Sequence, residues 1–140
     1  MSWDGYIDTL IGQTRDASGT NHCDSACIIG LDGGARWTTD THAQAMKVSP
    51  QEGATIAACF KSRDFSPFMQ NGIRVENNKY QFLREEDGKI VMAKKKELGA
   101  LTLQSTKTAI IIGHTAEGMQ QGNVNKAVGY IADYLETSGM

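Results

Sequence analysis

The chain has few features of a secreted, membrane or disordered protein. It contains two prolines and three cysteines in 140 residues, and no apolar run approaches the ~20 residues that cross a bilayer. The N-terminal sequence MSWDGYID has neither the basic nor the apolar region of a signal peptide. Because the cysteines are odd in number and match no disulfide framework, we expect a reducing, cytoplasmic location. Its 40% hydrophobic and 21% charged residues indicate one globular domain over residues 1–140.

Charge is unevenly distributed along the chain. Residues 1–60 carry three basic and seven acidic side chains, whereas residues 61–126 carry eleven basic and seven acidic ones. This split favours a basic surface that binds an acidic partner, with a protein, a phosphoinositide and a nucleic acid as the candidates. Surface charges that are only solvated and share no partner would give the same numbers of basic and acidic residues. Other patterns must therefore decide between these interpretations.

Helices are predicted at both ends of the chain and once between them. The first, over residues 2–11 with Ser2 as its N-cap, is predicted by four side chains at helical spacing: Trp3, Tyr6, Ile7 and Leu10. The sequence Ser49-Pro50-Gln51-Glu52 has the pattern of a capping box with proline at the first helical position, which predicts a helix over about 50–60. The last, over 121–137, is predicted by one apolar stripe: Val124, Val128, Ile131 and Leu135.

Strands are predicted in the intervening segments. Ala26–Leu31 and a run around Arg36–Thr39, separated by Gly33-Gly34, fit a strand, a turn and a strand. From Phe65 onward the apolar period is two, with strands expected over 79–83, 90–93, 101–104 and 109–112. The expected turns are Asn71-Gly72 and Asp87-Gly88, which suit tight hairpins, and the weaker Asn77-Asn78 and Ser105–Lys107. This order predicts an α+β fold built on an antiparallel meander.

Five short segments, in order from residue 3 to residue 126, give the most specific signal. They are WDGYID at 3–8, ACIIG at 26–30 followed by Trp37, FMQNGI at 68–73, KYQFLR at 79–84 and GNVNK at 122–126. In all five the chain resembles the profilin family. The resemblance implies a central antiparallel sheet with the N- and C-terminal helices packed on one face and smaller helices on the other.

The resemblance also implies a groove for proline-rich proteins. The expected groove residues are Trp3, Tyr6, Trp37, Tyr134 and Met140, with methionine where the family often ends in an aromatic residue. Aromatic rings with N–H and O–H donors suit a polyproline II helix, which is already stiff and loses little entropy on docking. Packing of the same rings in the core is the alternative interpretation.

A second surface, for monomeric actin, is implied in the same way. Its expected residues are Lys79, Phe82, Arg84, Lys94, Lys95, Lys96, Met119, Gly122, Asn125 and Lys126. Cations on a sheet can steer an acidic partner, and the same Arg84 and Lys94 to Lys96 are expected to bind phosphoinositide head groups weakly. In the family, binding to actin accelerates exchange of actin's nucleotide, which needs no catalytic residue in the chain. We therefore expect a monomeric, non-enzymatic protein of the actin cytoskeleton without a cofactor.

Patterns typical of enzymes and metal sites are weaker. His22, Cys23 and Cys27 fall short of the four ligands of a closed zinc site, so no metal is expected. The stretch GHTAEG at 113–118 lacks the Gly-Lys-Ser/Thr of a phosphate loop and is interpreted as a turn after the last strand. A nucleophilic pair of Cys59 and His114 is the best enzyme hypothesis, but Cys59 in an apolar helix favours the core.

Two binding functions remain beside the actin reading. A nucleic-acid interface is disfavoured, because Glu85, Glu86 and Asp87 follow the basic strand and would repel phosphates. A small-molecule or phosphoinositide sensor domain with no role in actin binding is the alternative, because a helix-covered antiparallel sheet can enclose a ligand cavity.

Overall fold

A computed structural model describes residues 3–140 and contains one six-stranded antiparallel sheet with the strand order β1-β6-β5-β4-β3-β2. The strands are β1 (Cys23–Gly30), β2 (Ile73–Val75), β3 (Asn78–Glu86), β4 (Ile90–Lys95), β5 (Gly99–Ser105) and β6 (Ala109–Ala116). The helices are α1 (Trp3–Gln13), α2 (Pro50–Ser62), α3 (Ser66–Asn71) and α4 (Gln121–Thr137). The predicted α+β architecture is confirmed, whereas the expected N-cap Ser2 lies outside the described residues.

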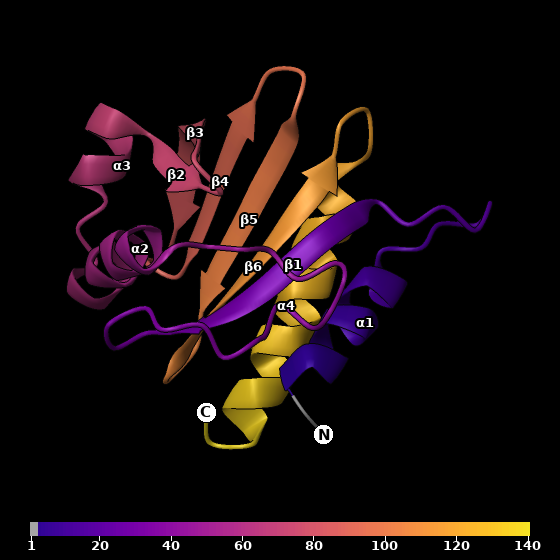
Figure 1. Ribbon diagram of the computed structural model, residues 1–140, viewed down its shortest axis with the longest axis horizontal. Helices are drawn as coiled ribbons and strands as arrows, with labels where there is room; N and C mark the ends of the chain where they lie inside the picture. The colour runs from indigo at the N-terminus through magenta and orange to yellow at the C-terminus, as the bar shows by residue number, and fades with distance from the viewer. Residues whose placement is uncertain (1–2) are drawn as a thin grey trace.

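The helices form two layers, one on each face of the sheet. Helices α1 and α4 lie side by side over β1, β6 and β5, while α2 and α3 lie on the opposite side (Figure 1). Alternation along β6 supplies both cores, because Ile110 and Ile112 pack beneath α2 and α3 whereas Ile111 packs beneath α1 and α4. None of the described helices is long and apolar enough to cross a membrane.

The capping box predicted at the start of α2 is present and reaches further than the sequence indicates. Ser49 Oγ accepts from the Glu52 N–H at 3.2 Å, and Glu52 Oε1 accepts from the Ser49 N–H at 3.0 Å. The same carboxylate accepts from the backbone N–H groups of Glu76 at 2.9 Å and Asn77 at 2.8 Å. It therefore fixes the turn between β2 and β3 at Glu76-Asn77, where φ is 52° and 64°. The turn begins one residue before the predicted Asn77-Asn78.

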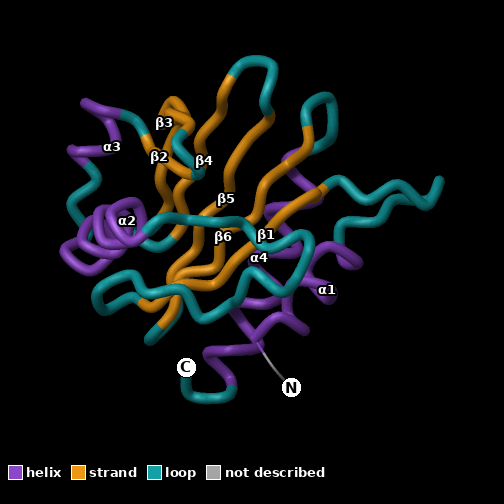
Figure 2. Tube along the Cα trace, in the orientation of Figure 1, coloured by secondary structure: helices purple, strands orange, loops and turns teal. Residues whose placement is uncertain are grey.

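The strand predicted around Arg36–Thr39 is absent, and this prediction was wrong. Residues 31–49 form a long loop that runs along β1 (Figure 2), with single bridges from Ile29 to Arg36 and from Ala26 to Ala45. The Trp37 N–H donates to the Ile28 carbonyl at 2.8 Å, but the chain then turns toward α1 instead of continuing the ladder.

The hairpin predicted at Asn71-Gly72 is also wrong, because this dipeptide ends helix α3. Gly72 has a φ of 74°, and its N–H donates to the Phe68 carbonyl at 2.8 Å. A six-residue helix cannot show a hydrophobic period, and Asn-Gly suits a helix end as well as a hairpin. The buried Phe68 ring anchors α3 against Phe60 and Phe65.

The turn predicted over residues 113–118 was wrong for residues 113–116, because strand β6 extends to Ala116 and the chain turns only after it. Gly113 lies inside the strand, where a Cβ would come within 3.1 Å of Val124 and 3.0 Å of Val128. The glycine lets α4 pack closely on the sheet. The Asp87-Gly88 turn between β3 and β4 is confirmed, with positive φ at both residues.

Candidate functional site

Four of the predicted groove residues stand in one row of aromatic rings. The Trp37 and Trp3 centroids are 4.7 Å apart, those of Trp3 and Tyr6 are 5.5 Å apart, and those of Tyr6 and Tyr134 are 6.0 Å apart. These separations lie in the range of attractive aromatic contacts. The long loop, α1 and α4 thus each supply part of a single surface, which we call the aromatic row (Trp3, Tyr6, Trp37 and Tyr134).

The aromatic row is backed by the core and is only partly covered. Trp3, Tyr6, Trp37 and Met140 are partly buried against the cluster beneath α1 and α4, and Tyr134 is 51% exposed. Partial burial raises the pKa of Tyr6, with the neighbouring Tyr134 as a further cause. A docking groove requires rings that the core supports on one side and that solvent reaches on the other.

The segment after α4 is attached to the turn between β5 and β6 through Met140. The Met140 backbone oxygen accepts from the Thr108 N–H at 2.6 Å and from the hydroxyls of Thr106 and Thr108, each at 2.8 Å. These bonds hold Met140 against the same cluster that supports the aromatic row. Tyr130, one turn before Tyr134, is 52% exposed and makes no ring contact within the described residues.

Trp37 is placed by hydrogen bonds between α1 and the long loop. The Asp4 carboxylate accepts from the Thr39 N–H at 2.7 Å, from the Thr39 hydroxyl at 2.5 Å and from the Thr41 hydroxyl at 3.2 Å. The hydrogen bonds from Thr39 lower the pKa of Asp4. We call this set of bonds the Asp4 latch. One turn further along α1, Asp8 pairs with His42 Nε2 at 2.7 Å.

A glycine beneath Trp37 completes this arrangement. A Cβ at Gly30 would lie 3.1 Å from Trp37 Nε1, so any larger residue would press on the indole. Sequence reasoning missed Gly30, Asp4 and Thr39 as groove-forming residues. In the sequence, Asp4 looks like any acidic residue in the first turn of a helix, and no nearby residue identifies Thr39 as its hydrogen-bond partner.

Part of the predicted actin surface forms a continuous patch on the α4 side of the sheet. Arg84 on β3 pairs with Met92 on β4, which pairs with Thr102 on β5. The Thr102 hydroxyl donates to Asn125 Oδ1 at 2.5 Å, and Asn125 Nδ2 contacts Met92 Sδ at 3.8 Å. The strands and the first turns of α4 therefore form one surface, beside which Gly122 and Lys126 are exposed.

The structure separates the three predicted lysines of β4. Lys94 lines an open hollow of about 240 Å³ together with Met119 and Gln121. Lys95 follows it on the strand, so its side chain belongs to the opposite face, and Lys96 lies in the turn after β4. Lys94 is thus the lysine that joins the patch at the start of α4.

Phe82 and Lys79 are not brought together with Arg84. A register shift between Phe82 and Arg84 places Phe82 opposite Ala93, and both pack with the core beneath α2 and α3. Phe82, Lys79 and the exposed Met69 line another hollow beside α3. Lys79 and Phe82 therefore lie at the start of β3, and Lys95 and Lys96 stand apart. The other predicted actin residues form the α4-side patch: Arg84, Lys94, Met119, Gly122, Asn125 and Lys126.

The cysteines of the enzyme and metal hypotheses are buried, and the histidines are hydrogen-bonded to neighbouring residues. Burial raises the pKa of Cys59, and it raises that of Cys27 to about 12, so neither is an activated thiol. His114 Nδ1 bonds Asp24 at 2.5 Å. His22 Nε2 bonds Asp16 at 2.8 Å, and its Nδ1 accepts from the backbone N–H of Gln120 at 2.8 Å.

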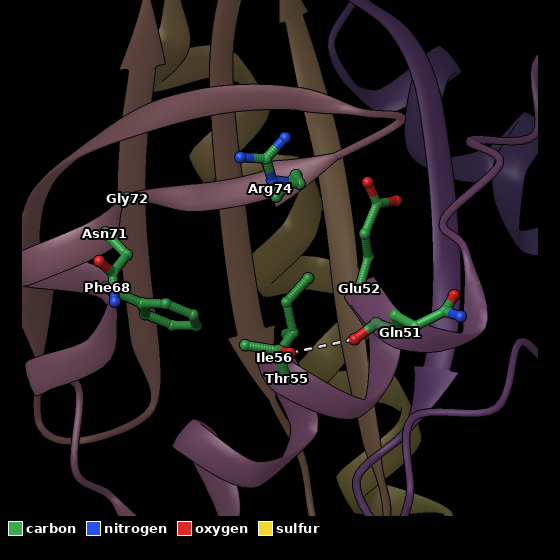
Figure 3. Close-up of a pocket in the computed structure, with 8 residues that line it drawn as sticks. All are labelled: Gln51, Glu52, Thr55, Ile56, Phe68, Asn71, Gly72 and Arg74. Carbon is green, nitrogen blue, oxygen red and sulfur yellow. Dashed lines mark hydrogen bonds between the residues drawn. The ribbon is translucent and has the colours of Figure 1, made fainter.

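A further hollow of about 220 Å³ lies between α2, α3 and β2 (Figure 3). Phe68 of α3 and Ile56 of α2 line it from two sides, and Arg74 of β2 lies above them in the view (Figure 3). Its buried acid, Glu52, is already engaged by the backbone of Ser49, Glu76 and Asn77. This hollow is smaller than the ~300 Å³ lower end of ligand pockets, whereas the hollow beside α3 and the one around Lys107 reach about 320 Å³ and 350 Å³.

A family model described as Profilin matches residues 1–140. The chain is 69% identical to a profilin of Heliocidaris crassispina and 66% identical to one of Suberites domuncula, and each alignment covers 100% of both chains. Its structure is similar to Acanthamoeba castellanii profilin II, with a TM-score of 0.79, 31% identity and coverage of 99% of this chain and 100% of that one. Mouse profilin IIa in complex with a double repeat from the FH1 domain of mDia1 matches with a TM-score of 0.72 and 22% identity over 100% of both chains. The chain therefore belongs to the profilin family.

Proposed function

We propose that this protein binds monomeric actin on the α4-side patch and docks proline-rich ligands on the aromatic row. The observation that carries the proposal is the row itself, in which three separate segments bring Trp37, Trp3, Tyr6 and Tyr134 into contact. Family membership and the complex of mouse profilin IIa with an FH1 double repeat support it.

The aromatic row suits proline-rich chains for a physical reason. A polyproline II helix has no internal hydrogen bonds, so its carbonyls are free to accept from the indole N–H and phenol O–H groups of the row. Its pyrrolidine rings can lie on the aromatic faces. Because the ligand is stiff and the rings are supported from below, little conformational entropy is lost on docking.

A fluorescence titration tests the groove directly. Trp3 and Trp37 are the two tryptophans of the chain, and both belong to the row. We expect a saturable change in tryptophan emission when the purified protein is titrated with a proline decamer. An unchanged spectrum in a folded sample, together with no heat of binding by calorimetry, would contradict the groove.

The α4-side patch provides the proposed actin contacts. Arg84, Lys94 and Lys126 offer positive charge, while Met119 and the stem of Asn125 offer apolar surface near its centre. Binding there would bias the actin monomer toward a state that releases its nucleotide faster, without chemistry in this chain. The test is the rate at which a fluorescent nucleotide leaves monomeric actin, with and without the protein.

Phosphoinositide binding is a further part of the proposal, carried by Arg84, Lys94, Lys95 and Lys96. We expect this binding to be weak, because Arg84 pairs with Glu86 at 3.1 Å and because Lys95 and Lys96 do not share a face with Lys94. We expect co-sedimentation with vesicles that contain a phosphorylated inositol lipid and its loss on adding salt. Equal sedimentation with uncharged vesicles would contradict it.

A further inference from the structure

The three segments that build the aromatic row contain carboxylates but no lysine or arginine. These segments are residues 3–13 of α1, residues 37–46 of the long loop and residues 127–140 at the end of the chain. Together they carry five carboxylates: Asp4, Asp8, Asp40, Asp133 and Glu136. Basic residues flank these segments: Arg36 pairs with Asp40 at 2.7 Å, Lys47 follows the loop segment, and Lys126 precedes the last segment.

Among the described residues, no lysine or arginine pairs with Asp4, Asp8 or Asp133. Asp4 adjoins Trp3 and bonds only neutral threonine groups, and a lowered pKa keeps it ionised. Asp133 precedes Tyr134 on α4 and is exposed, with no salt bridge among the described residues. Asp8 is 72% exposed, and its partner is the imidazole of His42.

The other two acids contribute less. Asp40 is neutralised by Arg36, and Glu136 lines a hollow with Lys107 near the turn between β5 and β6. The remaining charge is therefore concentrated along α1 and around Tyr134. Proline itself is uncharged, so this field does not act on the docked proline run but on the residues that flank it.

We infer that the aromatic row selects proline-rich segments flanked by lysine or arginine over those flanked by acidic residues. The inference rests on the proposed docking of proline-rich ligands and names the chemistry of the preferred ligand. Rim charges of this kind act mainly on the association rate, and their effect depends on ionic strength. The proline run supplies contact area, and the flanking cations supply the discrimination.

Three peptides separate the inference from the proposed function. Each is a proline decamer, with two lysines, two glutamines or two glutamates at either end, and tryptophan emission reports binding. At about 0.01 M salt, where screening extends over about 30 Å, we expect the lysine-flanked peptide to bind about tenfold more tightly than the glutamate-flanked one. At 1 M salt, where screening extends over about 3 Å, the three affinities converge.

A variant pair localises the effect to the row. Asp133→Asn removes a carboxylate that makes no salt bridge, and it should reduce the preference for lysine over glutamate about twofold while leaving the affinity for the glutamine-flanked peptide unchanged. The matched control is Glu117→Gln, an exposed carboxylate after β6 beside Met119, which should leave the preference unchanged.

The outcomes distinguish failure of the inference about charge from failure of the proposed function. Equal affinities for the three peptides at low salt overturn the inference but leave the proposed function standing. A preference that persists at 1 M salt also overturns it, because an electrostatic preference cannot survive that screening. Failure of all three peptides to bind overturns the proposed function together with the inference.

Discussion

The aromatic row and the α4-side patch lie on parts of the molecule that differ in both charge and construction. The row is built from three segments that are distant in sequence, and these segments carry acidic side chains but no lysine or arginine. The patch is built from neighbouring strands and the start of α4, and it carries Arg84, Lys94 and Lys126. Opposite charges favour opposite partners, so the two proposed ligands would not compete for one site.

The two regions also differ in what holds them together. The patch follows from strand register, so backbone hydrogen bonds fix it as soon as the sheet forms. The row depends on the Asp4 latch and on Gly30, because Trp37 lies in a loop that contributes only single bridges to the sheet. We therefore expect the row to be the more sensitive region to single substitutions away from the ligand itself.

The largest expected effect is the loss of proline-peptide binding in Trp3→Ala. Trp3 contacts both Trp37 and Tyr6, so its removal breaks the row at its centre. Aromatic anchors of this kind are worth about 2 kcal/mol or more, which predicts at least a roughly 30-fold weaker affinity by calorimetry. Actin binding should change little. Parallel loss of both activities in a folded variant would contradict the separation of the two regions.

The next effect is a weaker affinity for actin in Lys126→Glu. The substitution places a negative charge on the exposed side of α4, where the proposed actin surface is positive. We expect about tenfold weaker binding to monomeric actin at low ionic strength, measured by fluorescence anisotropy of labelled actin. Lys89→Glu is the matched control, because Lys89 lies in the turn at the opposite end of β4 from Lys94. If both variants lose the same affinity, the net charge of the protein explains the loss and Lys126 is not part of the actin-binding surface.

A smaller effect is expected from the Asp4 latch. Asp4→Ala removes the acceptor of three hydrogen bonds, which frees Thr39 and Thr41 and lets Trp37 move away from Trp3. Proline-peptide affinity should fall about threefold, and the near-ultraviolet circular dichroism of the tryptophans should decrease. Thr39→Val keeps the backbone bond to Asp4 and should lose less. An unchanged dichroism spectrum in Asp4→Ala would show that Trp37 is held by other contacts.

The smallest effect is the acid sensitivity of the same latch. The pKa of Asp4 is lowered from its ordinary value of 3.8, chiefly by hydrogen bonds from Thr39, so folding favours the carboxylate form. The stabilisation is therefore complete above the unfolded pKa and is lost as the pH falls from that value through the lowered pKa of the folded state. The dichroism of the tryptophans should hold from neutral pH to about pH 4 and then decline. Asp4→Asn should remove this part of the transition, and an identical pH profile in the variant would exclude Asp4 as its source.

Local sequence determined the elements whose signals lie within a few residues. The capping box at Ser49 and Glu52 and the tight turn at Asp87-Gly88 appear where expected. The last helix follows its apolar stripe over Gln121–Thr137 as predicted. Trp3 and Tyr6 share a face because they are three residues apart on a helix, which is a property of helical geometry alone.

Tertiary structure decided the features that depend on contacts between distant residues. Glu52 holds the turn at Glu76-Asn77, where a positive φ at Glu76 has no local explanation. The register shift after Phe82 separates it from Arg84, although both lie in the same strand, β3. The bond between Asp4 and Thr39, which are 35 residues apart in the chain, helps to place Trp37 beside Trp3. Each of these depends on a partner that is near in space but far in sequence, so no local pattern could reveal it.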